Sequence, residues 1–498
     1  MDTYILAIDR GSTNLKLVLF NQKGEQAHLV SVPNQDVIAD QPGWREFDLD
    51  IVWQQLCALT KQVVGGFCRP EQIAAISFSG HGNGLILLDE DRRPNGKGIY
   101  SLDDRAGSIV DRWQHDGRHA EAQEVLRCPI MVGGPLPLFA WIKENQPERA
   151  GKARHCFFVK DWLRLCLGGD IATDYTDASG GSLLDHARQC FPQGIFDRLG
   201  VPELFDMLPP LRSSTEQAGV VSEQAANSTG LVAGTPLFMG GQDVSLGAAG
   251  VGDLSEEILV SVFGSWSVSA LNVVNTAGLP LVINHPIDGH FLSGVGDGNA
   301  GIALDTMIRL CFADVANDCA KSGGSVHLAL EQQVSSTDKT SLLFVPHLFG
   351  SMLNPSAVAG LVGLRAHTQR GEIYKAVCEG ILIGYLVNIS LLPPFAGVST
   401  VWLIGGGAKS DLLGQMMADI FGREVLVPAD TEITARGAAV CAMIGQPDSD
   451  PPFGIPAPRV RRKFTPDATM AGYYAKKSAL ISKVLLEGDP LLEAAACL

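Results

Sequence analysis

Two stretches of the chain, about half a sequence apart, share one layout: an apolar run, a turn of glycine with small polar residues, and a second apolar run. The first stretch spans residues 6–20 with its turn at Gly11–Asn14, and the second spans residues 258–274 with its turn at Gly264–Trp266. Apolar runs joined by such a short turn predict a β-hairpin. The repeated layout predicts two similarly built domains. Coincidence is the alternative, because glycine–serine turns are common.

The length of 498 residues also favours two large domains, since a single core rarely serves so long a chain. The glycine-rich stretch Gly240–Gly252 is the expected boundary, which gives an N-terminal domain over 1–247 and a C-terminal domain over 248–498. After the first hairpin the pattern predicts a third strand, a helix that Asp48 or Asp50 caps, and a buried strand at 73–78. This alternation predicts an α/β fold.

Composition limits the partners and the location. The net charge is −16, which disfavours nucleic acid and anionic membranes as partners. The 11 cysteines include no CxxC pair, which is typical of reduced thiols in the cytoplasm. The N-terminus carries no secretory signal. The apolar stretch Ile381–Leu392 is interrupted and too short to span a bilayer.

The turn after the first strand is a candidate phosphate site. It contains Asp9 and then Gly11, Ser12, Thr13 and Asn14. Backbone N–H groups of such a turn can bind phosphate oxygens, and an acid at the strand end can hold Mg²⁺. The alternative is an ordinary hairpin made of turn-forming residues. The second turn, with Gly264 and Ser265, favours the phosphate interpretation, because two such hairpins could clamp phosphate between the domains.

A third glycine turn, Gly405–Gly407, lies between an apolar strand and a helix that Ser410 can cap. Helix N-termini attract anions, and bare glycine can admit a flat base. No GK[ST] follows, so this is not a Walker A loop. The alternative is a plain strand-to-helix turn. We favour a nucleotide site at Gly406, Gly407 and Ser410.

Polar residues of the first half form the expected substrate side. Asp243 ends a strand within a glycine-rich turn and is the candidate general base, with helix capping as the alternative. Gln242 beside it, His81 between two glycines, and the pair Asp103 and Arg105 offer donors and acceptors for a polyhydroxylated ligand. A lone histidine is more often structural.

One glycine pattern is a weak motif for a different activity. Gly296–Gly301 fits GxGxxG, but the strand before it is short and no acid follows at the expected distance. A dinucleotide-dependent oxidoreductase is therefore a low-ranking alternative function.

The motifs in their order resemble those of the FGGY carbohydrate kinases over nearly the whole chain. The matching positions are Asp9-x-Gly11-Ser12-x-Asn14, Pro42-Gly43-Trp44-x-Glu46-x-Asp48, Gly241-x-Asp243, Gly264-Ser265-Trp266, Ala359–Leu364 through Glu379, and Gly405-Gly406-Gly407-Ala408-x-Ser410. The resemblance implies two actin-like (ribonuclease H-like) domains with a catalytic cleft between them. It also implies ATP and Mg²⁺ as cofactors and a small sugar or polyol as substrate.

By the same resemblance, each candidate residue has an expected role. Asp9 is the metal-linked carboxylate, and Asp243 is the base. Gly11–Asn14 and Gly264–Ser265 are the phosphate hairpins, and Gly406, Gly407 and Ser410 lie at the nucleotide. His81, Asp103 and Arg105 fall where family members contact the sugar.

The sequence departs from the family pattern mainly on the substrate side. The departures are Ser12 where threonine is usual, Cys378 at a signature position, Gly350–Met352 after the aromatic loop, and Ile99–Asp103 without the usual tryptophan. Several of these features resemble L-xylulose kinases and xylulokinase-type pentulose kinases. The segment Gly98–Val110 also resembles erythritol kinases. A polyol kinase and a non-enzymatic actin-like regulator are the alternative functions, and a homodimer is an open expectation.

Overall fold

In the computed structural model, residues 2–35, 37–38, 40–334, 339–348, 350, 357–446, 459–489 and 492 are described. The chain divides into two compact units. Unit 1 comprises residues 1–254, 273–292 and 432–458, and unit 2 comprises residues 255–272, 293–431 and 459–498. Two segments of the C-terminal half therefore pack within unit 1. The predicted domain boundary at 247/248 stays a prediction.

Unit 1 is built on a seven-stranded sheet in the order β12-β13-β6-β1-β2-β3, with β14 beside β6. Its strands are β1 (Tyr4–Arg10), β2 (Asn14–Asn21), β3 (Gln26–Pro33), β6 (Ile73–Gly80), β12 (Gln217–Val220), β13 (Pro236–Phe238) and β14 (Gly241–Gln242). Shorter strands are β4 (Val37–Ile38), β5 (Glu46–Phe47), β7 (Ile86–Leu88), β8 (Gly98–Ile99), β9 (His155–Phe157), β10 (Thr173–Asp174), β11 (Leu211–Arg212) and β17 (Ile283–Asn284).

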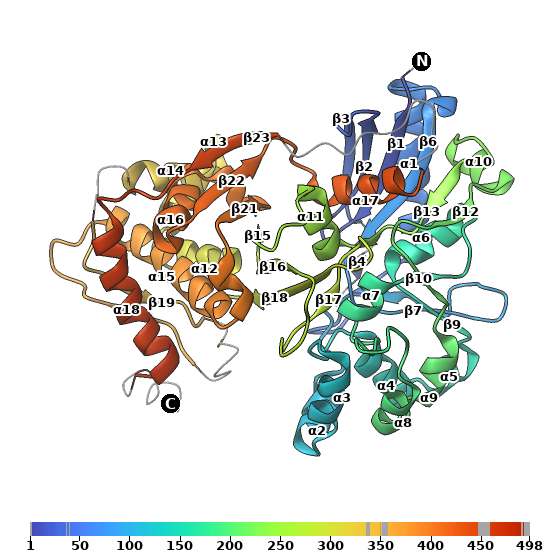
Figure 1. Cartoon of the computed structure of the whole chain (residues 1–498), viewed down its shortest axis with the longest axis horizontal. Coiled ribbons are helices and arrows are strands. Elements are labelled where there is room, and N and C mark those ends of the chain that lie inside the picture. The colour runs from blue at the N-terminus through green and yellow to red at the C-terminus, as the bar shows by residue number, and fades with distance from the viewer. Residues whose placement is uncertain are drawn as a thin grey trace. The chain divides into compact units, whose positions relative to one another are not determined.

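The helices of unit 1 come from both ends of the sequence. They are α1 (Leu49–Gly66), α2 (Gly107–His115), α3 (Arg118–Leu126), α4 (Pro135–Asn145), α5 (Pro147–Lys152), α6 (Val159–Leu167), α7 (Tyr175–Gly180), α8 (Gln193–Leu199), α9 (Pro202–Met207), α10 (Glu223–Thr229), α11 (Asp243–Val251) and α17 (Ile433–Ile444), with a 3₁₀ turn at Pro70–Gln72. Figure 1 shows the orange-red α17 against the blue strands of the N-terminal sheet. Close packing explains two glycines: a Cβ at Gly437 of α17 would lie 2.0 Å from the Leu246 carbonyl oxygen of α11, and one at Gly250 of α11 would lie 2.0 Å from the Ile433 carbonyl oxygen of α17.

Unit 2 contains the sheet strands β18-β16-β15-β21-β22-β23, in that order. Its strands are β15 (Ile258–Phe263), β16 (Ser267–Val273), β18 (Phe291–Asp297), β19 (Leu343–Val345), β20 (Gly360–Val362), β21 (Thr400–Ile404), β22 (Glu424–Pro428) and β23 (Val460–Phe464). Its helices are α12 (Gly301–Cys311), α13 (Ala313–Ser322), α14 (Val326–Val334), α15 (Arg370–Ser390), α16 (Asp411–Phe421) and α18 (Ala471–Glu487), with 3₁₀ turns at Pro393–Gly397 and Gly406–Lys409.

The two sheets repeat one pairing scheme, which supports the repeat predicted from the sequence. β1 pairs antiparallel with β2 and parallel with β6. β15 in the same way pairs antiparallel with β16 and parallel with β21. The predicted meander β1-β2-β3 is present, and Asp48 caps α1 as expected by accepting hydrogen bonds from the backbone N–H groups of Asp50 and Ile51.

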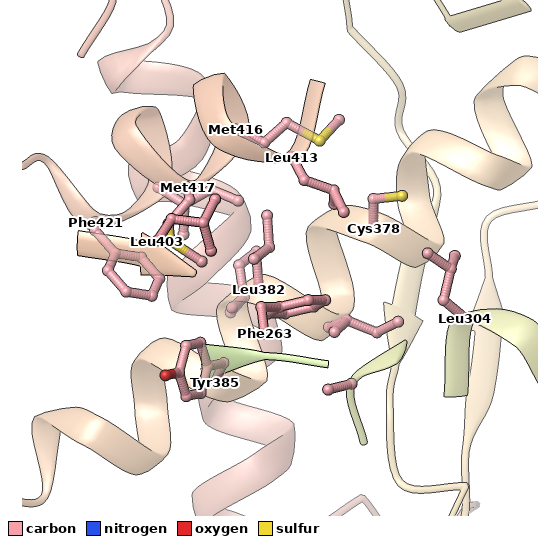
Figure 2. Close-up of a cluster of buried hydrophobic side chains, with 14 of the residues drawn as sticks. Phe263, Leu304, Cys378, Leu382, Tyr385, Leu403, Leu413, Met416, Met417 and Phe421 are labelled. Carbon is pink, nitrogen blue, oxygen red and sulfur yellow. The ribbon is translucent and has the colours of Figure 1, made fainter. Parts of the chain in front are cut away.

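The core of unit 2 is centred on α15. By length and composition this helix could cross a membrane, but 78% of its most apolar window is buried inside the structure, as in a core helix. Figure 2 shows part of this cluster, in which Phe263 lies among Leu382, Leu413 and Tyr385. Cys378, one of the departures noted above, is buried here. Ser351 and Met352, part of another departure, lie outside the described residues.

Candidate active site

The carboxyl ends of three parallel strands bring the polar residues of unit 1 together. Backbone register places Asp9 of β1 beside Ser79 of β6, and Ser79 beside Gly241 of β14. The next row along these strands is Arg10, Gly80 and Gln242. His81 and Asp243 follow directly in the chain. Three segments that are far apart in sequence thus end at one edge of the sheet, where ligands of α/β folds commonly bind.

Asp243 is the first residue of α11. Gln242 occupies the N-cap position and makes no side-chain cap hydrogen bond, while Oδ1 of Asp243 accepts the hydrogen bond of the next backbone N–H, from Val244, at 2.7 Å. Burial and the nearby charge of Asp9 raise the pKa of Asp243 to about 7. Asp243 is therefore not the N-cap residue that the alternative interpretation required.

Asp9 is buried, and its Oδ1 has no hydrogen-bond partner. Burial raises its pKa, while the charge of Lys16 opposes that rise. Lys16 lies directly opposite Asp9 in the β1–β2 register, and its Nζ is 2.6 Å from Oε2 of Glu432. Lys16 was not among the residues predicted from the sequence. Its position across a short hairpin from Asp9 was the signal that could have identified it.

The turn after β1 has two exposed residues at its tip, while the carbonyls of Gly11 and Thr13 accept hydrogen bonds from within the protein. The Gly11 N–H donates to the Asn14 carbonyl at 3.1 Å, and Ser12 and Thr13 are exposed. A Cβ at Gly11 would meet only the Asn14 carbonyl oxygen, at 3.8 Å. Packing therefore does not require glycine at position 11, and the bare backbone leaves space for a ligand to approach.

His81 and Gln242 present buried polar atoms that have no partner. Both ring nitrogens of His81 and Oε1 of Gln242 make no hydrogen bond. Burial and the charge of Arg10 lower the pKa of His81 to about 3, so its imidazole is neutral at pH 7. The Gln242 side chain lies between Gly82 and Gly180, where an added Cβ would come within 1.8 Å of Nε2 or 2.3 Å of Oε1 respectively. These two glycines leave the space that the amide occupies.

Asp103 and Arg105 are joined to each other. The Asp103 carboxylate accepts hydrogen bonds from Nε and Nη2 of Arg105 at 2.7 and 2.8 Å and from the Arg45 N–H at 2.7 Å. The guanidinium lies 3.9 Å from the Trp44 ring centre and 5.2 Å from that of Trp141. In this structure the pair holds the segments around residues 44 and 103 together, and its direct contact with a sugar stays a prediction.

Unit 2 contains a pocket of about 710 Å³ that gathers all five residues predicted there for nucleotide binding. These residues are Gly264, Ser265, Gly406, Gly407 and Ser410. Ser410 caps α16 as predicted, because its Oγ accepts the Leu413 N–H at 2.9 Å. A Cβ at Gly407 would lie 2.6 Å from Cδ1 of Phe263, so glycine is required there.

Other residues of this pocket were not predicted. They are Phe263, Gly301, Leu304, Asp305, Ser325, His327, Leu328, Glu331, Lys409 and Leu413. Most lie on α12 and α14, whose sequences carry only an amphipathic pattern, so no local motif identifies them. The GxGxxG pattern at 296–301 links β18 to α12, and α13 and α14 follow rather than a parallel strand. It therefore lacks the βαβ context of a dinucleotide site.

Family comparisons identify the class of protein. The N-terminal domain of the FGGY family of carbohydrate kinases matches residues 4–250, and the C-terminal domain of that family matches residues 260–445. The chain belongs to this family and is a carbohydrate kinase. The predicted family and two-domain actin-like α/β fold are thus confirmed.

Two relatives and one solved structure show which members of the family the chain resembles. The chain is 32% identical over 465 residues to the L-xylulose/3-keto-L-gulonate kinase of Escherichia coli (strain K12), covering 89% of each chain. It is 30% identical over 455 residues to the xylulose kinase of Bacillus subtilis (strain 168), covering 89% of this chain and 88% of the other. A ligand-bound xylulose kinase structure from Lactobacillus acidophilus shares the fold, with a TM-score of 0.86, 23% identity, and coverage of 99% and 100%.

Proposed function

We propose that this kinase transfers the γ-phosphoryl group of ATP to a hydroxyl of a pentulose, with xylulose as the first candidate. The names of its relatives, L-xylulose/3-keto-L-gulonate kinase and xylulose kinase, support this substrate class. The observation that carries the proposal is Asp243: a half-buried aspartate at a sheet edge, whose pKa is raised to about 7 by desolvation and by the nearby charge of Asp9, a buried carboxylate.

Asp243 is the proposed general base. A sugar hydroxyl is a poor nucleophile until its proton is accepted, and a positioned carboxylate typically contributes ~10²–10⁴-fold. A pKa of about 7 makes Asp243 a stronger base than an ordinary aspartate, while a large share remains ionised at neutral pH.

The surroundings of Asp9 fit a magnesium ion. Its carboxylate is buried with one oxygen unpartnered, so a cation would supply the missing interaction. No group of three or more His, Cys, Asp or Glu side chains with metal-site geometry occurs among the described residues. A single carboxylate such as that of Asp9 suits Mg²⁺, which commonly uses one or two carboxylates together with water and substrate phosphates. When bound, Mg²⁺ would neutralise charge on the phosphates, and Lys16 is placed to add a second positive charge near Asp9.

The ATP site is proposed for the pocket of unit 2. Its volume of about 710 Å³ is in the range of small-molecule sites. The backbone of Gly406, where an added Cβ would meet only the Phe263 carbonyl oxygen at 3.8 Å, leaves room for the flat base. In the second hairpin turn the Gly264 N–H donates to the Trp266 carbonyl, and the N–H and hydroxyl of Ser265 are offered to phosphate. The turn at Gly11–Asn14 is the proposed phosphate contact of unit 1.

The unpartnered atoms of His81 and Gln242 are the proposed sugar contacts. A buried polar atom without a hydrogen bond costs about 1–3 kcal/mol, so a hydroxyl that pairs with it recovers stability. Neutral His81 offers one donor and one acceptor, and Gln242 offers an acceptor. Both suit hydroxyl groups, each of which can donate and accept.

Location and assembly remain parts of the proposal. The cysteines in the described part of the chain are free thiols, which suits the reducing cytoplasm. The net charge of −16 suits neither nucleic acid nor membrane partners. The predicted homodimer stays a prediction that light scattering would test.

A coupled assay of ADP release across pentuloses, pentitols and tetritols tests the substrate. We expect the highest kcat/KM with a pentulose, strict dependence on a divalent cation, and loss of turnover by at least ~10²-fold in Asp243→Asn. Preference for a tetritol or pentitol would refute the substrate class. An Asp243→Asn variant with more than about a tenth of the wild-type rate would refute the base.

A further inference from the structure

A buried charged cluster lies behind the turn that carries Asp243. Lys160 of α6 is completely buried, and its Nζ lies 2.7 Å from Asp161, 2.9 Å from Asp174 and 3.1 Å from Asp177. Figure 1 shows α6, β10 and α7, the elements that supply these residues, grouped in the green part of the chain. Such a cluster is costly to bury, and replacing it with apolar residues is often neutral or stabilising. The cost of burying these charges therefore favours a role beyond stability.

The cluster reaches the Asp243 turn through one carboxylate oxygen. Oδ2 of Asp174 accepts hydrogen bonds from the Thr176 N–H at 2.8 Å, the Thr176 hydroxyl at 2.6 Å and the Ser214 hydroxyl at 2.8 Å. Lys160 holds the other oxygen, Oδ1. The Asp174 carboxylate is thus fixed on both sides and has little freedom to rotate.

Thr176 and Ser214 in turn bind the backbone of that turn. Because the Thr176 hydroxyl donates to Asp174, it is free to accept the Gln242 N–H, which lies at 2.8 Å. The Ser214 carbonyl accepts the Gly240 N–H at 3.0 Å. A Cβ at Gly241 would lie 2.7 Å from the Thr176 hydroxyl, so glycine permits this close contact. The N–H groups of Gly240 and Gln242, both within three residues of Asp243, are therefore held by Ser214 and Thr176. Both of these residues are hydrogen-bonded to the Asp174 carboxylate.

We propose that Thr176 and Asp174, anchored by Lys160, are positioning residues that hold the Gln242–Asp243 backbone so that Asp243 meets the sugar hydroxyl. This inference rests on the proposed role of Asp243 as base. Thr176 itself touches no substrate in this scheme. Its effect is geometric, and a misplacement of about 1 Å in a catalytic group can cost ~10²-fold in rate.

The test compares Thr176→Val, which is close in shape but lacks the hydroxyl, with Thr176→Ser, which retains it. We expect Thr176→Val to lower kcat by ~10- to 100-fold with KM for ATP within about twofold. Thr176→Ser should keep kcat within about threefold of wild type. The matched control is Thr60→Val, because Thr60 is a completely buried threonine of unit 1 whose hydroxyl bonds only to its own helix, at the Leu56 carbonyl. It should leave kcat unchanged.

Equal kcat values for Thr176→Val and Thr60→Val would overturn the proposal. If Thr176→Val does not fold, a folded Thr176→Ser with more than a tenfold loss of kcat would also overturn it. The double variant Thr176→Val/Asp243→Asn separates the two claims. If Thr176 acts through Asp243, the double variant should be no slower than Asp243→Asn alone, and an additive loss would refute the positioning role. Near-normal turnover of Asp243→Asn alone would instead refute the base assignment, and with it this inference.

Discussion

Replacing Asp243 with asparagine should stabilise the protein at high pH while it abolishes most of the activity. The pKa of this carboxyl rises from its ordinary value of 3.8 to about 7, mainly because of burial and then because of the charge of Asp9. One pKa unit between two states is worth about 1.4 kcal/mol, so the ionised carboxylate costs the folded state about 4 kcal/mol at most. Asparagine resembles the protonated acid in shape and carries no charge.

The sign of the pH dependence follows from linkage. The folded state binds the proton of Asp243 more tightly than the unfolded state does, because the folded pKa is the higher one. The contribution of this group to the stability of the folded state is therefore largest below about pH 4. It falls between about pH 4 and 7 and is constant above that. The advantage of Asp243→Asn over wild type should grow across the same interval.

Scanning calorimetry at pH 5 and pH 8 in EDTA measures the effect without a bound divalent cation. Local relaxation returns part of the cost, so we expect a gain of about 2–4 kcal/mol at pH 8. For a large unit, in which each kcal/mol moves Tm by about 2 °C, this corresponds to roughly 4–8 °C. The gain should be clearly smaller at pH 5. Asp91→Asn, at an exposed turn position, controls for the loss of one negative charge from an acidic chain.

Two results would refute this reasoning. A Tm of Asp243→Asn at or below that of wild type at both pH values would mean that the carboxylate is not destabilised by burial. An equal gain at pH 5 and pH 8 would mean that the gain does not come from ionisation. In either case the pKa argument for Asp243 as a base near pH 7 would lose its support, whatever the variant's activity.

Three further outcomes are expected. Asp9→Asn should fold normally and lose turnover strongly, most of all at limiting Mg²⁺, and a titration with Mg²⁺ that matches wild type would exclude the metal role. Gly407→Ala places a Cβ 2.6 Å from Cδ1 of Phe263, so KM for ATP should rise by ~10-fold, whereas Gly472→Ala, with nothing within 4 Å of the added Cβ, should not change it. With Mg·ATP saturating, kcat/KM for the sugar should fall as the pH is lowered through the pKa of Asp243, which the positive charge of bound Mg²⁺ places below its value of about 7 in the cation-free protein. A profile that stays flat down to the pH at which the protein unfolds would contradict the base assignment.

Local patterns were sufficient to predict the elements that carry the phosphate and nucleotide candidates. The two hairpins, the Asp48 cap of α1 and the Ser410 cap of α16 are encoded within a few residues each, by alternation, turn residues and capping side chains. The same is true of the repeat, because both halves place a glycine turn between antiparallel strands. These features could be predicted because their physical causes are local.

The contacts that shape the site of unit 1 have distant causes and were not predicted. Lys16 pairs with Glu432, which is 416 residues away in the sequence, because the segment 432–458 returns to unit 1. Asp103 was expected to contact the sugar from its position in a motif. In the structure its carboxylate also accepts a hydrogen bond from the N–H of Arg45, which is 58 residues away, while its contact with a sugar stays a prediction.

This difference explains why the reaction class is easier to infer than the substrate. Phosphate is held largely by backbone N–H groups, which glycine-rich turns supply, and such turns are visible in the sequence. A sugar is recognised by side-chain atoms whose availability depends on every neighbour that could occupy them. Gln242 illustrates the point: its amide occupies space that Gly82 and Gly180 leave open, and its Oε1 is left without a partner. Replacing either glycine with alanine should therefore change sugar selectivity more than KM for ATP, because neither residue belongs to a nucleotide or phosphate motif.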